Sequence, residues 1–444
     1  MVLPGAAVRD AYLQGATRVL HGYITARNGK LHLEASIEDL ETRKTVLHYA
    51  NSDGALRAID GLAHSIDPAA HAFPVTDPQA IESWVKAVRT QQGYEEAAAR
   101  APDFGLLYVT WAESLSAKND KEGALRVIQQ ALARPTLKGD IDRARLELIK
   151  ADLEGNLPAR GDAFDKVAKL SPNDVNAIAA AAETNFRLRR FPAAIEQYRA
   201  ALALQPESSA LENQIGYAQA LSGDLAGGKQ TLEQYSKRPG QEANGLDSLG
   251  EIHFYHGKFA EAEKYFLQSH EKNPAANAGY DLYKAALAHW LAGDIAGADA
   301  LHQKYADFLT KQSRNVPTVG PRELLQARWE WTTGRAAAAR RRIENRPEYA
   351  ALLVLWNEEA AKLPPPFALL AARKFAEAEP VWKKAYEQSS PSTDALSRTL
   401  YAWCLSETGH KPEAKELLKY YAIPQQSDGI FVSLIYPRFL ELRK

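Results

Sequence analysis

The chain has 444 residues and a mass of 49.0 kDa, and its 54 basic and 55 acidic side chains leave a formal charge of −1. This balance excludes the strong, sequence-independent attraction to nucleic acid or anionic lipid that a basic chain would have. A hydrophobic fraction of 45% and a charged fraction of 25% are typical of a folded protein. The single cysteine excludes an intrachain disulfide and a cysteine-based zinc site.

We recognise no targeting signal in the sequence as written. No window reaches the roughly 18 apolar residues that a membrane-spanning helix needs. The first ten residues have neither a basic start nor a long apolar stretch, so we expect no export signal in the chain as written. The only methionine stands at position 1, which suggests a fragment of a longer protein. The cellular compartment is therefore left open. The chain as written is expected to be cytoplasmic, and it is expected to be periplasmic or extracytoplasmic if a signal or membrane segment precedes it.

The N-terminal residues favour a small sheet followed by a helix. Residues 17–26 are rich in β-branched and aromatic side chains, and Asn28-Gly29 is a strong hairpin signal. Apolar and polar residues alternate over 31–38, which is typical of a half-buried strand, and residues 45–49 predict a third strand. Ser52 and Asp53 are expected to cap a helix whose apolar residues run from position 56 to 66.

The central sequence repeats with a period of about 34 residues. Pro172 and Pro206 are one such period apart, Pro274 follows two periods further on, and Gly240 lies midway between the last two prolines. Each unit predicts two helices that cross closely, because each helix carries a small residue where the two meet. Proline then ends the second helix, since it lacks the helical N–H. The paired small residues are Ala182 and Ala194, Gly216 and Gly228, and Gly250 and Ala262.

A helix-turn-helix period of about 34 residues is that of the tetratricopeptide repeat (TPR), and this stretch resembles that family. Weaker units in the same frame start near Gly105 upstream and near Ala395 downstream. We therefore expect about eight or nine helical hairpins over residues 80–425. The resemblance implies a mainly α fold, a right-handed superhelical TPR solenoid that carries a small α+β N-terminal domain.

The N-terminal pattern resembles a second family. The residues GATRVLHGYI from Gly15, the Asn28-Gly29 turn, LHLEASIEDLETRK from Leu31 and the helix that follows are similar to the second half of the TolB-like N-terminal domain. In bacteria this domain often precedes TPR arrays in membrane-linked transcriptional regulators and serine/threonine kinases. The resemblance implies a role in bacterial signal transduction.

We divide the chain into three parts. Residues 1–75 are expected to form the small α+β domain, residues 76–425 the repeat array and residues 426–444 a C-terminal capping segment. That segment contains the apolar run from Ile430 to Tyr436, which we expect to fold back on the array. Left exposed, such a run would be an association surface.

The TPR resemblance implies a binding groove, because the first helices of such hairpins line the concave side of the solenoid. Asparagine can pair with the N–H and C=O of a peptide, and aromatic rings supply rigid contact area. The acidic residues there are expected to favour a basic or neutral ligand. The alternative is that some of the aromatic residues form the core between repeats. The expected groove residues are Asn176, Glu183, Phe186, Asn213, Tyr217, Asn244, Asp247, Glu251, Phe254, Tyr280, Tyr283 and Trp290.

No sequence pattern is specific for catalysis, a cofactor or a metal. His253 and His256 share a helix face, but a full ligand set is missing, so we expect surface or groove histidines. Cys404 lies in an apolar helix pattern and is expected to pack in the core. Phosphate-binding and nucleophile-elbow motifs are absent from the sequence.

An arginine cluster near residue 340 allows two interpretations. Arginine and tryptophan together can bind RNA by charge and stacking. Consecutive arginines, however, fan around a helix at about 100° per residue, which favours a solvated face that contacts an acidic neighbour. The cluster follows Trp329 and Trp331 and consists of Arg335, Arg340, Arg341, Arg342 and Arg346.

We hypothesise a non-enzymatic scaffold that binds a protein or peptide ligand in the concave groove, as the sensory or partner-binding part of a bacterial regulatory system. One alternative is a small-molecule sensor or enzyme-associated module, with a pocket between the N-terminal domain and the first repeats. Another is RNA binding through the arginine cluster, which the charge balance disfavours. The oligomeric state is left open.

Overall fold

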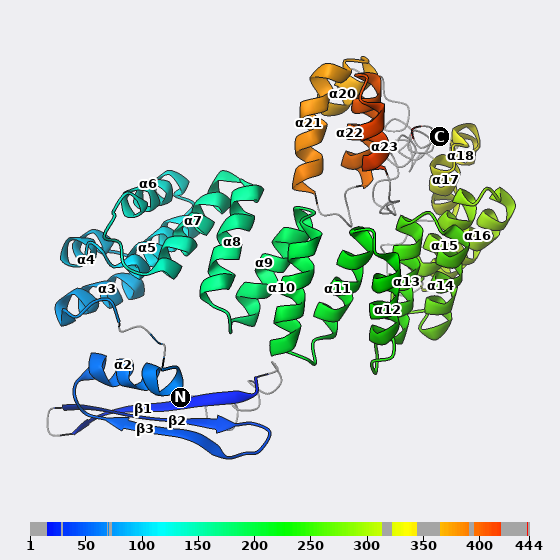
Figure 1. Ribbon diagram of the computed structural model, residues 1–444. Helices are drawn as coiled ribbons and strands as arrows, with labels where there is room; N and C mark the ends of the chain where they lie inside the picture. Colours follow the sequence, from blue (N-terminus) through cyan, green and yellow to red (C-terminus); the bar gives the residue numbers. More distant parts are fainter. Residues whose placement is uncertain are drawn as a thin grey trace. The chain divides into compact units, whose positions relative to one another are not determined.

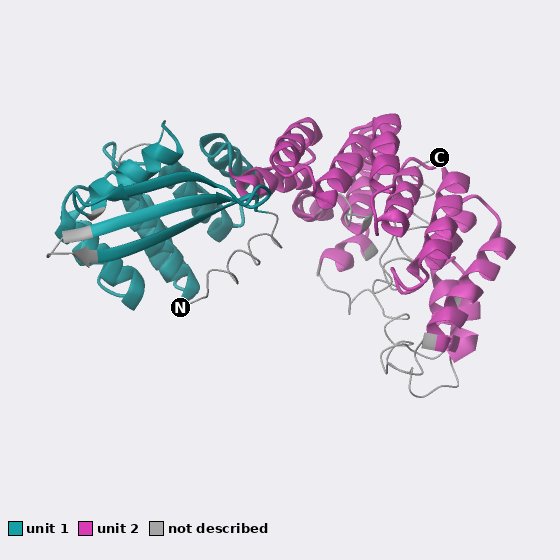
Figure 2. Cartoon of the chain, turned by 90° about the horizontal axis from the view of Figure 1, so that it is seen from below, with its two compact units in different colours: residues 1–173 teal, residues 174–444 magenta. Residues whose placement is uncertain are grey.

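The computed structural model describes residues 16–27, 30–68, 70, 73–312, 322–343, 365–389, 395–418 and 442. Its contacts divide the chain into two compact units, residues 1–173 and residues 174–444, which we describe one at a time (Figure 2). In the described ranges the chain is mainly helical, with one three-stranded sheet near the N-terminus (Figure 1).

Unit 1 begins with an antiparallel sheet that one helix covers. β1 (Arg18–Arg27), β2 (Lys30–Asp39) and β3 (Thr45–Asn51) pair in the order β1-β2-β3, and α2 (Ala55–Ile66) packs on β2 and β3. Leu33 and Ala35 of β2 are buried, as expected for a strand with one buried face. The strands and the helix follow the order predicted from the sequence, and Asn28-Gly29 lies outside the described residues.

The start of α2 differs from the prediction. Its N-cap is Gly54, and no side chain caps the helix. Ser52 instead contacts His32 on the neighbouring strand, with 2.7 Å between Oγ and Nδ1. Asp53 accepts a hydrogen bond of 3.4 Å from the Asn51 side chain. Ser52 and Asp53 therefore form side-chain contacts with the strands β2 and β3 instead of capping α2.

Helical hairpins fill the rest of unit 1. Their core combines Phe104, Leu107, Tyr108, Ile128 and Leu146. The helices are α3 (Pro78–Thr90), α4 (Tyr94–Arg100), α5 (Gly105–Ala117), α6 (Lys121–Leu132), α7 (Asp140–Glu154) and α8 (Leu157–Leu170).

Unit 2 continues the hairpins in the described ranges, and each helix packs against the next within its pair. The first group is α9 (Val175–Arg187), α10 (Phe191–Leu204), α11 (Ser209–Leu221), α12 (Leu225–Tyr235), α13 (Glu242–Tyr255), α14 (Phe259–Lys272), α15 (Tyr280–Leu291) and α16 (Ile295–Gln312). The second is α17 (Arg322–Thr332), α18 (Ala336–Ile343), α20 (Pro365–Ala371), α21 (Phe375–Gln388), α22 (Ala395–Glu407) and α23 (Lys411–Leu417).

The described helices after α2 form ten hairpins, from α3–α4 to α22–α23. The sequence predicted about eight or nine, because the hairpin α3–α4 precedes the first unit that the repeat frame identified. This TPR-like helical solenoid is the architecture expected for the array. Its handedness and the borders at residues 75 and 425 stay predictions, and the capping segment 426–444 lies outside the described residues except for residue 442.

The turn inside each hairpin needs a left-handed residue. From α7–α8 to α13–α14 these residues follow one another at the spacing of the sequence repeat: Gly155, Arg189, Gly223 and Gly257, with φ of 65°, 59°, 104° and 70°. Glycine suits this position because it lacks the Cβ that penalises positive φ. The period read from the sequence therefore reappears as a period in backbone conformation.

Small residues at the helix crossings are also confirmed. A Cβ added to Gly216 would lie 2.5 Å from the Leu232 side chain, and one added to Gly250 would lie 2.5 Å from the Phe266 ring. A Cβ on Gly228 would lie 2.7 Å from the carbonyl oxygen of Gly216. Since that oxygen belongs to the backbone of the paired helix, a larger residue has to push the two helices apart.

We therefore predict that Gly228→Ala destabilises unit 2 by about 1–3 kcal/mol, the usual range for overpacking. Urea unfolding followed by circular dichroism would measure the loss. The control is Ala226→Leu, which adds more volume at an exposed position of the same helix and should leave stability nearly unchanged. Equal stability of Gly228→Ala and the parent protein would refute the close crossing.

Candidate partner-binding surface

All twelve predicted groove residues lie on the first helices of four hairpins, α9, α11, α13 and α15. Those on α9 are Asn176, Glu183 and Phe186; those on α11 are Asn213 and Tyr217; those on α13 are Asn244, Asp247, Glu251 and Phe254; and those on α15 are Tyr280, Tyr283 and Trp290. The helices place them at corresponding positions of successive units, but their exposure to solvent differs widely.

Three of the aromatic rings are core residues. Phe186, Phe254 and Tyr283 are only 4%, 0% and 6% exposed. Phe186 and Phe254 end a first helix, and each ring packs edge-on against the residue that starts the next helix, with centroids 5.7 Å and 5.4 Å from those of Phe191 and Phe259. These rings belong to the core, as the alternative to groove binding expected, although the contacts of Phe186 and Phe254 lie within their own hairpins and not between repeats. We remove the three rings from the candidate surface.

The remaining polar residues form the accessible part of the surface. Asn176, Glu183 and Asn244 are exposed, and Asn213 is partly exposed. Glu183 accepts a hydrogen bond of 2.9 Å from the hydroxyl of Tyr198, which orients the carboxylate. Asn176 and Asn244 are two repeats apart, as are Glu183 and Glu251, so α9 and α13 carry the same pair of groups in the same register.

Asp247 and Glu251 do not form a purely acidic surface, because a lysine lies between them. Lys284 Nζ is 2.7 Å and 2.8 Å from the carboxylate oxygens of Asp247 and 2.5 Å from Glu251 Oε1. Tyr217 donates its hydroxyl to the other oxygen of Glu251, at 2.7 Å. We call these four residues the charged cluster. The two acidic residues that were expected to favour a basic or neutral ligand are therefore paired with a lysine of the chain itself.

Burial governs the protonation of the charged cluster. Burial raises the pKa of Asp247, and the positive charge of Lys284 only partly opposes this. Burial alone would lower the pKa of Lys284, but Glu251 and Asp247 outweigh it and raise that pKa. Lys284 thus stays charged and holds the two carboxylates together between α13 and α15. The sequence signal that could have found it is a lone lysine in the apolar helix YDLYKAALAHWL.

We predict that Lys284→Met destabilises unit 2 by about 3–5 kcal/mol at pH 8, because two carboxylates lose their buried partner. The loss should shrink at pH 5, where Asp247 takes up a proton more readily. Urea unfolding at both pH values tests this. In the double variant Lys284→Met/Asp247→Leu, much of the stability should return, and no recovery would contradict the pairing.

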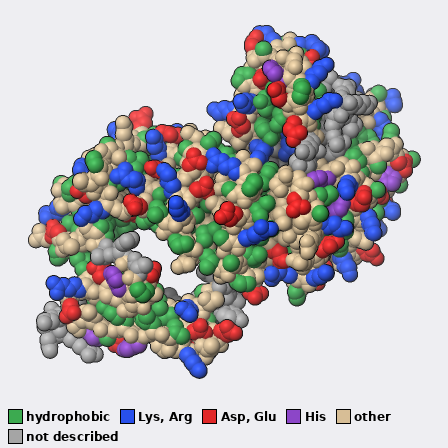
Figure 3. Space-filling view, viewed as in Figure 1, with side chains coloured by type: hydrophobic (Ala, Val, Ile, Leu, Met, Phe, Trp, Pro, Cys, Tyr) green, Lys and Arg blue, Asp and Glu red, His purple; other side chains and the backbone are tan. Residues whose placement is uncertain are grey.

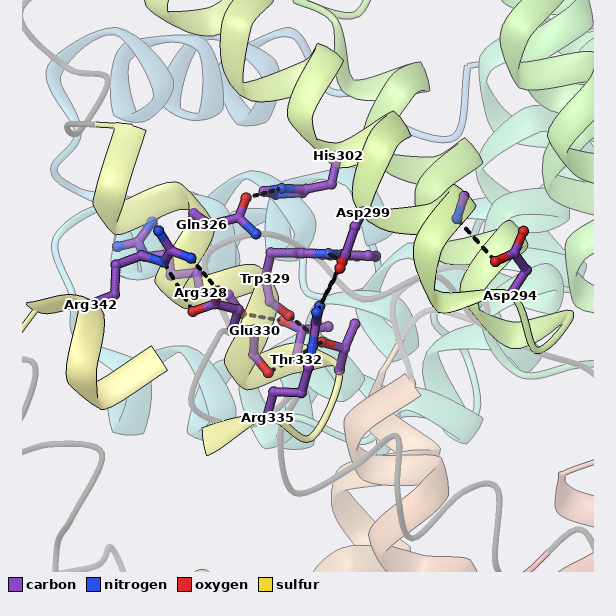
Figure 4. A network of polar contacts seen from close by, with 12 residues as sticks. Asp294, Asp299, His302, Gln326, Arg328, Trp329, Glu330, Thr332, Arg335 and Arg342 are labelled. Atoms are coloured by element: carbon purple, nitrogen blue, oxygen red, sulfur yellow. Dashed lines mark hydrogen bonds and ion pairs between the residues drawn. The ribbon is translucent and has the colours of Figure 1, made fainter. Parts of the chain in front are cut away.

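A second polar network joins α16, α17 and α18 (Figure 4). The His302 ring stacks on Trp329, with centroids 4.7 Å apart and an angle of 8° between the planes. Trp329 donates its indole N–H to Asp299 at 2.6 Å, and Arg335 binds both oxygens of that carboxylate at 2.7 Å each. Arg342 binds both oxygens of Glu330, its Nε at 3.0 Å.

These pairs bear on the arginine cluster. Arg335 and Arg342 each form an ion pair with an acidic neighbour, and the Arg340 guanidinium lies 5.7 Å from the centroid of Trp331. The interpretation as a face that contacts acidic neighbours is supported for Arg335 and Arg342, whereas Arg340 contacts an aromatic ring, and Arg346 lies outside the described residues. Basic and acidic side chains are interspersed over the face drawn in Figure 3.

His302 makes stability depend on pH. Burial lowers the pKa of its ring from 6.5 to about 4, more than its Gln326 contact and the Asp299 charge raise it. Between these values the unfolded chain binds the proton first. The contribution of His302 to the free energy of unfolding is therefore fully present above pH 6.5. It is lost as the pH drops to 4, by up to about 3 kcal/mol.

We predict that His302→Phe, which keeps a ring against Trp329 but cannot take up a proton, removes most of this loss. Urea midpoints from pH 4 to 7 measure it. His289→Gln is the control: Glu263, through its hydrogen bond, raises the pKa of His289, as does Asp294. Stability from that group is present below pH 6.5 and lost as the pH rises through the raised pKa. An unchanged acid profile in His302→Phe would refute the assignment.

The remaining candidates for chemistry have structural roles. His253 Nδ1 is 2.7 Å from the carbonyl oxygen of Leu249, and His256 Nε2 is 2.8 Å from that of Ala220. Cys404 is fully buried, as predicted for a packing residue, and burial raises the pKa of its thiol to about 12. Within the described residues no group of three or more His, Cys, Asp or Glu could hold a metal ion, and no helix could cross a membrane.

No protein-family model and no curated protein matches the sequence. Among solved structures, the MamA protein is similar over 41% of this chain and 98% of its own, with 17% identity and a TM-score of 0.33. Yeast Tom70 is similar over 68% of this chain and 60% of its own, with 17% identity and a TM-score of 0.37. A Naa15/Naa10 complex bound to HypK reaches a TM-score of 0.40 at 13% identity, over 82% of this chain and 64% of its own.

These scores are too low to transfer a function from any of the three proteins. The class to which the chain belongs follows from its own hairpins, turns and crossings: it is a TPR-like helical-repeat protein that carries a small three-stranded sheet before its repeats.

Proposed function

We propose that the chain is a protein-interaction scaffold, and that the first helices α9, α11, α13 and α15 bind a peptide segment of a partner protein. The observation that supports this most directly is a repeated pair of polar groups whose asparagine is exposed in both copies. Asn176 and Glu183 on α9 recur as Asn244 and Glu251 on α13. Asn244 also has a structural contact, because its Oδ1 accepts a hydrogen bond of 2.8 Å from the Tyr235 hydroxyl, while its side chain stays exposed.

The chemistry of this surface suits a polypeptide. An asparagine amide can donate to a peptide C=O and accept from a peptide N–H, so a row of such groups can bind a main chain. Tyr217, Tyr280 and Trp290 are partly exposed and add aromatic contact area beside the amides. Since Lys284 compensates the carboxylates of the charged cluster, we expect a ligand of mixed polarity rather than a strongly basic one.

The regulatory context belongs to the same proposal. The TolB-like resemblance of the N-terminal residues suggests that the partner is a component of a bacterial signalling system. A catalytic role has no support in the buried thiol, the internally bonded histidines or the paired charges described above.

A photo-crosslinking amino acid placed at Asn176 or at Asn244 tests the proposal in the source cells. Both positions should yield adducts with the same protein, because a peptide along the surface passes both. The control position is Arg199, an exposed residue of the second helix α10. Adducts at Arg199 of equal yield, or different proteins at the two asparagines, would contradict a shared groove.

A purified peptide from the adduct then allows a quantitative test. Asn176→Ala/Asn244→Ala should weaken its binding about tenfold or more in isothermal titration, since two sets of peptide hydrogen bonds are lost, each worth roughly 1 kcal/mol. Arg199→Ala should bind like the parent protein.

A further inference from the structure

The sheet of unit 1 has an apolar face that the helix α2 covers only in part (Figure 1). Leu20 of β1 pairs directly with Ile37 of β2, and Ile24 pairs with Leu33. Directly paired residues of antiparallel strands point to the same face, so these four side chains share one face. The helix packs on β2 and β3, where Leu33 is buried, but Leu20 and Ile24 are 51% and 66% exposed. The apolar face therefore continues beyond the helix onto β1.

β1 is also an edge strand, because the strand order of the described sheet is β1-β2-β3. Natural edge strands are usually protected by proline, lysine, an inward-pointing charge or a bulge. Residues 19–25, VLHGYIT, contain no proline and no Lys, Arg, Asp or Glu, and β1 pairs with β2 without a bulge. Arg18 precedes this stretch, and Asp39 of β2, at 3.9 Å, compensates its charge. The outer side of β1 is therefore suited to pairing with a further strand.

Gly22 lies at the centre of this stretch, although its own chain does not require a glycine there. Its φ is not positive, and a Cβ added to it would lie 3.8 Å from the Glu34 carbonyl oxygen and 3.9 Å from the Ala35 Cβ, which are ordinary contacts. A glycine inside a strand weakens it and often marks a place where another backbone comes close. Leu20 and Ile24 flank Gly22 at equal distances in the sequence. This symmetry indicates a strand that can pair with a copy of itself.

We propose that two copies of the chain associate through β1, as antiparallel edge strands related by a two-fold axis at Gly22. In this register Leu20 of each copy lies opposite Ile24 of the other, on the face that α2 partly covers. The two sheets become one continuous sheet, and the exposed apolar pairs cover each other between the two copies of α2. A register shifted by one residue would turn the apolar residues of the two copies to opposite faces, so the apolar pattern selects the register centred on Gly22.

This interface is isologous, because the same strand contributes to it from both copies. It lies in unit 1, whereas the surface proposed to bind a partner lies in unit 2, so the two proposals stand or fall separately. Two linked copies present two equivalent binding surfaces, which strengthens the binding of any partner that can reach both of them.

Light scattering after size-exclusion chromatography of the full-length chain tests the association. We expect the mass to rise with concentration toward twice the 49.0 kDa of one chain. Ile24→Lys should raise the dissociation constant of the dimer about tenfold or more, because it places a charge in the apolar contact. Val85→Lys on α3 is the matched control, since Val85 is also exposed, at 43%, and it should associate like the parent protein. A monomer at every concentration would overturn the proposal, whatever else then covers β1, and so would an equal loss in both variants.

Cysteine cross-linking tests the register, since the natural Cys404 is fully buried. A mixture of Leu20→Cys and Ile24→Cys proteins should form a disulfide-linked dimer, because Cα atoms of opposite residues are roughly 5 Å apart. Each variant alone should give a several-fold lower yield, because its two cysteines are then four residues apart along the strands, roughly 13 Å. Equal yields, or no cross-link in the mixture, would overturn the pairing about Gly22. Circular dichroism that matches the parent protein confirms that each variant is folded.

Discussion

The close crossing of two helices through small residues is the contact on which the rest of the fold depends. Gly216 and Gly228 bring the backbones of α11 and α12 so near that a single added Cβ would meet a carbonyl oxygen. This approach lets Leu232 and other large residues fill the space behind the crossing, where they are fully buried. Each hairpin then exposes an apolar face that only the next hairpin can cover, so stability propagates from neighbour to neighbour along the array.

Paired charges join several helices of this array. Lys284 bridges the first helices α13 and α15, and Asp299 and Arg335 join α16 to the turn after α17. Replacing one member of a buried set leaves its partners unpaired, which costs more than an apolar residue at the same position would. These sets therefore connect particular helices, α13 with α15 and α16 with the turn after α17.

The sequence predicted the features that depend on local spacing. The repeat period, the small residues twelve apart and the alternation in β2 can each be read within one or two repeats. Contacts that depend on the exact phase between repeats could not be read in this way. Lys284 contacts Asp247 across two successive hairpins, where the helix α15 is out of strict phase with the repeat. The burial of Phe186 and Phe254 depends on how each ring turns toward the following helix, which helical periodicity does not specify.

Some turns of this array carry a residue other than the usual glycine, and the side chain of that residue can make contacts that the other turns lack. A turn that glycine would satisfy carries Arg189, and its side chain binds Tyr386, 197 residues later. Arg373 occupies an equivalent turn but pairs only within its own neighbourhood, so the conformation alone does not create a long-range contact. The distance in sequence explains why no local pattern could reveal the Arg189 contact.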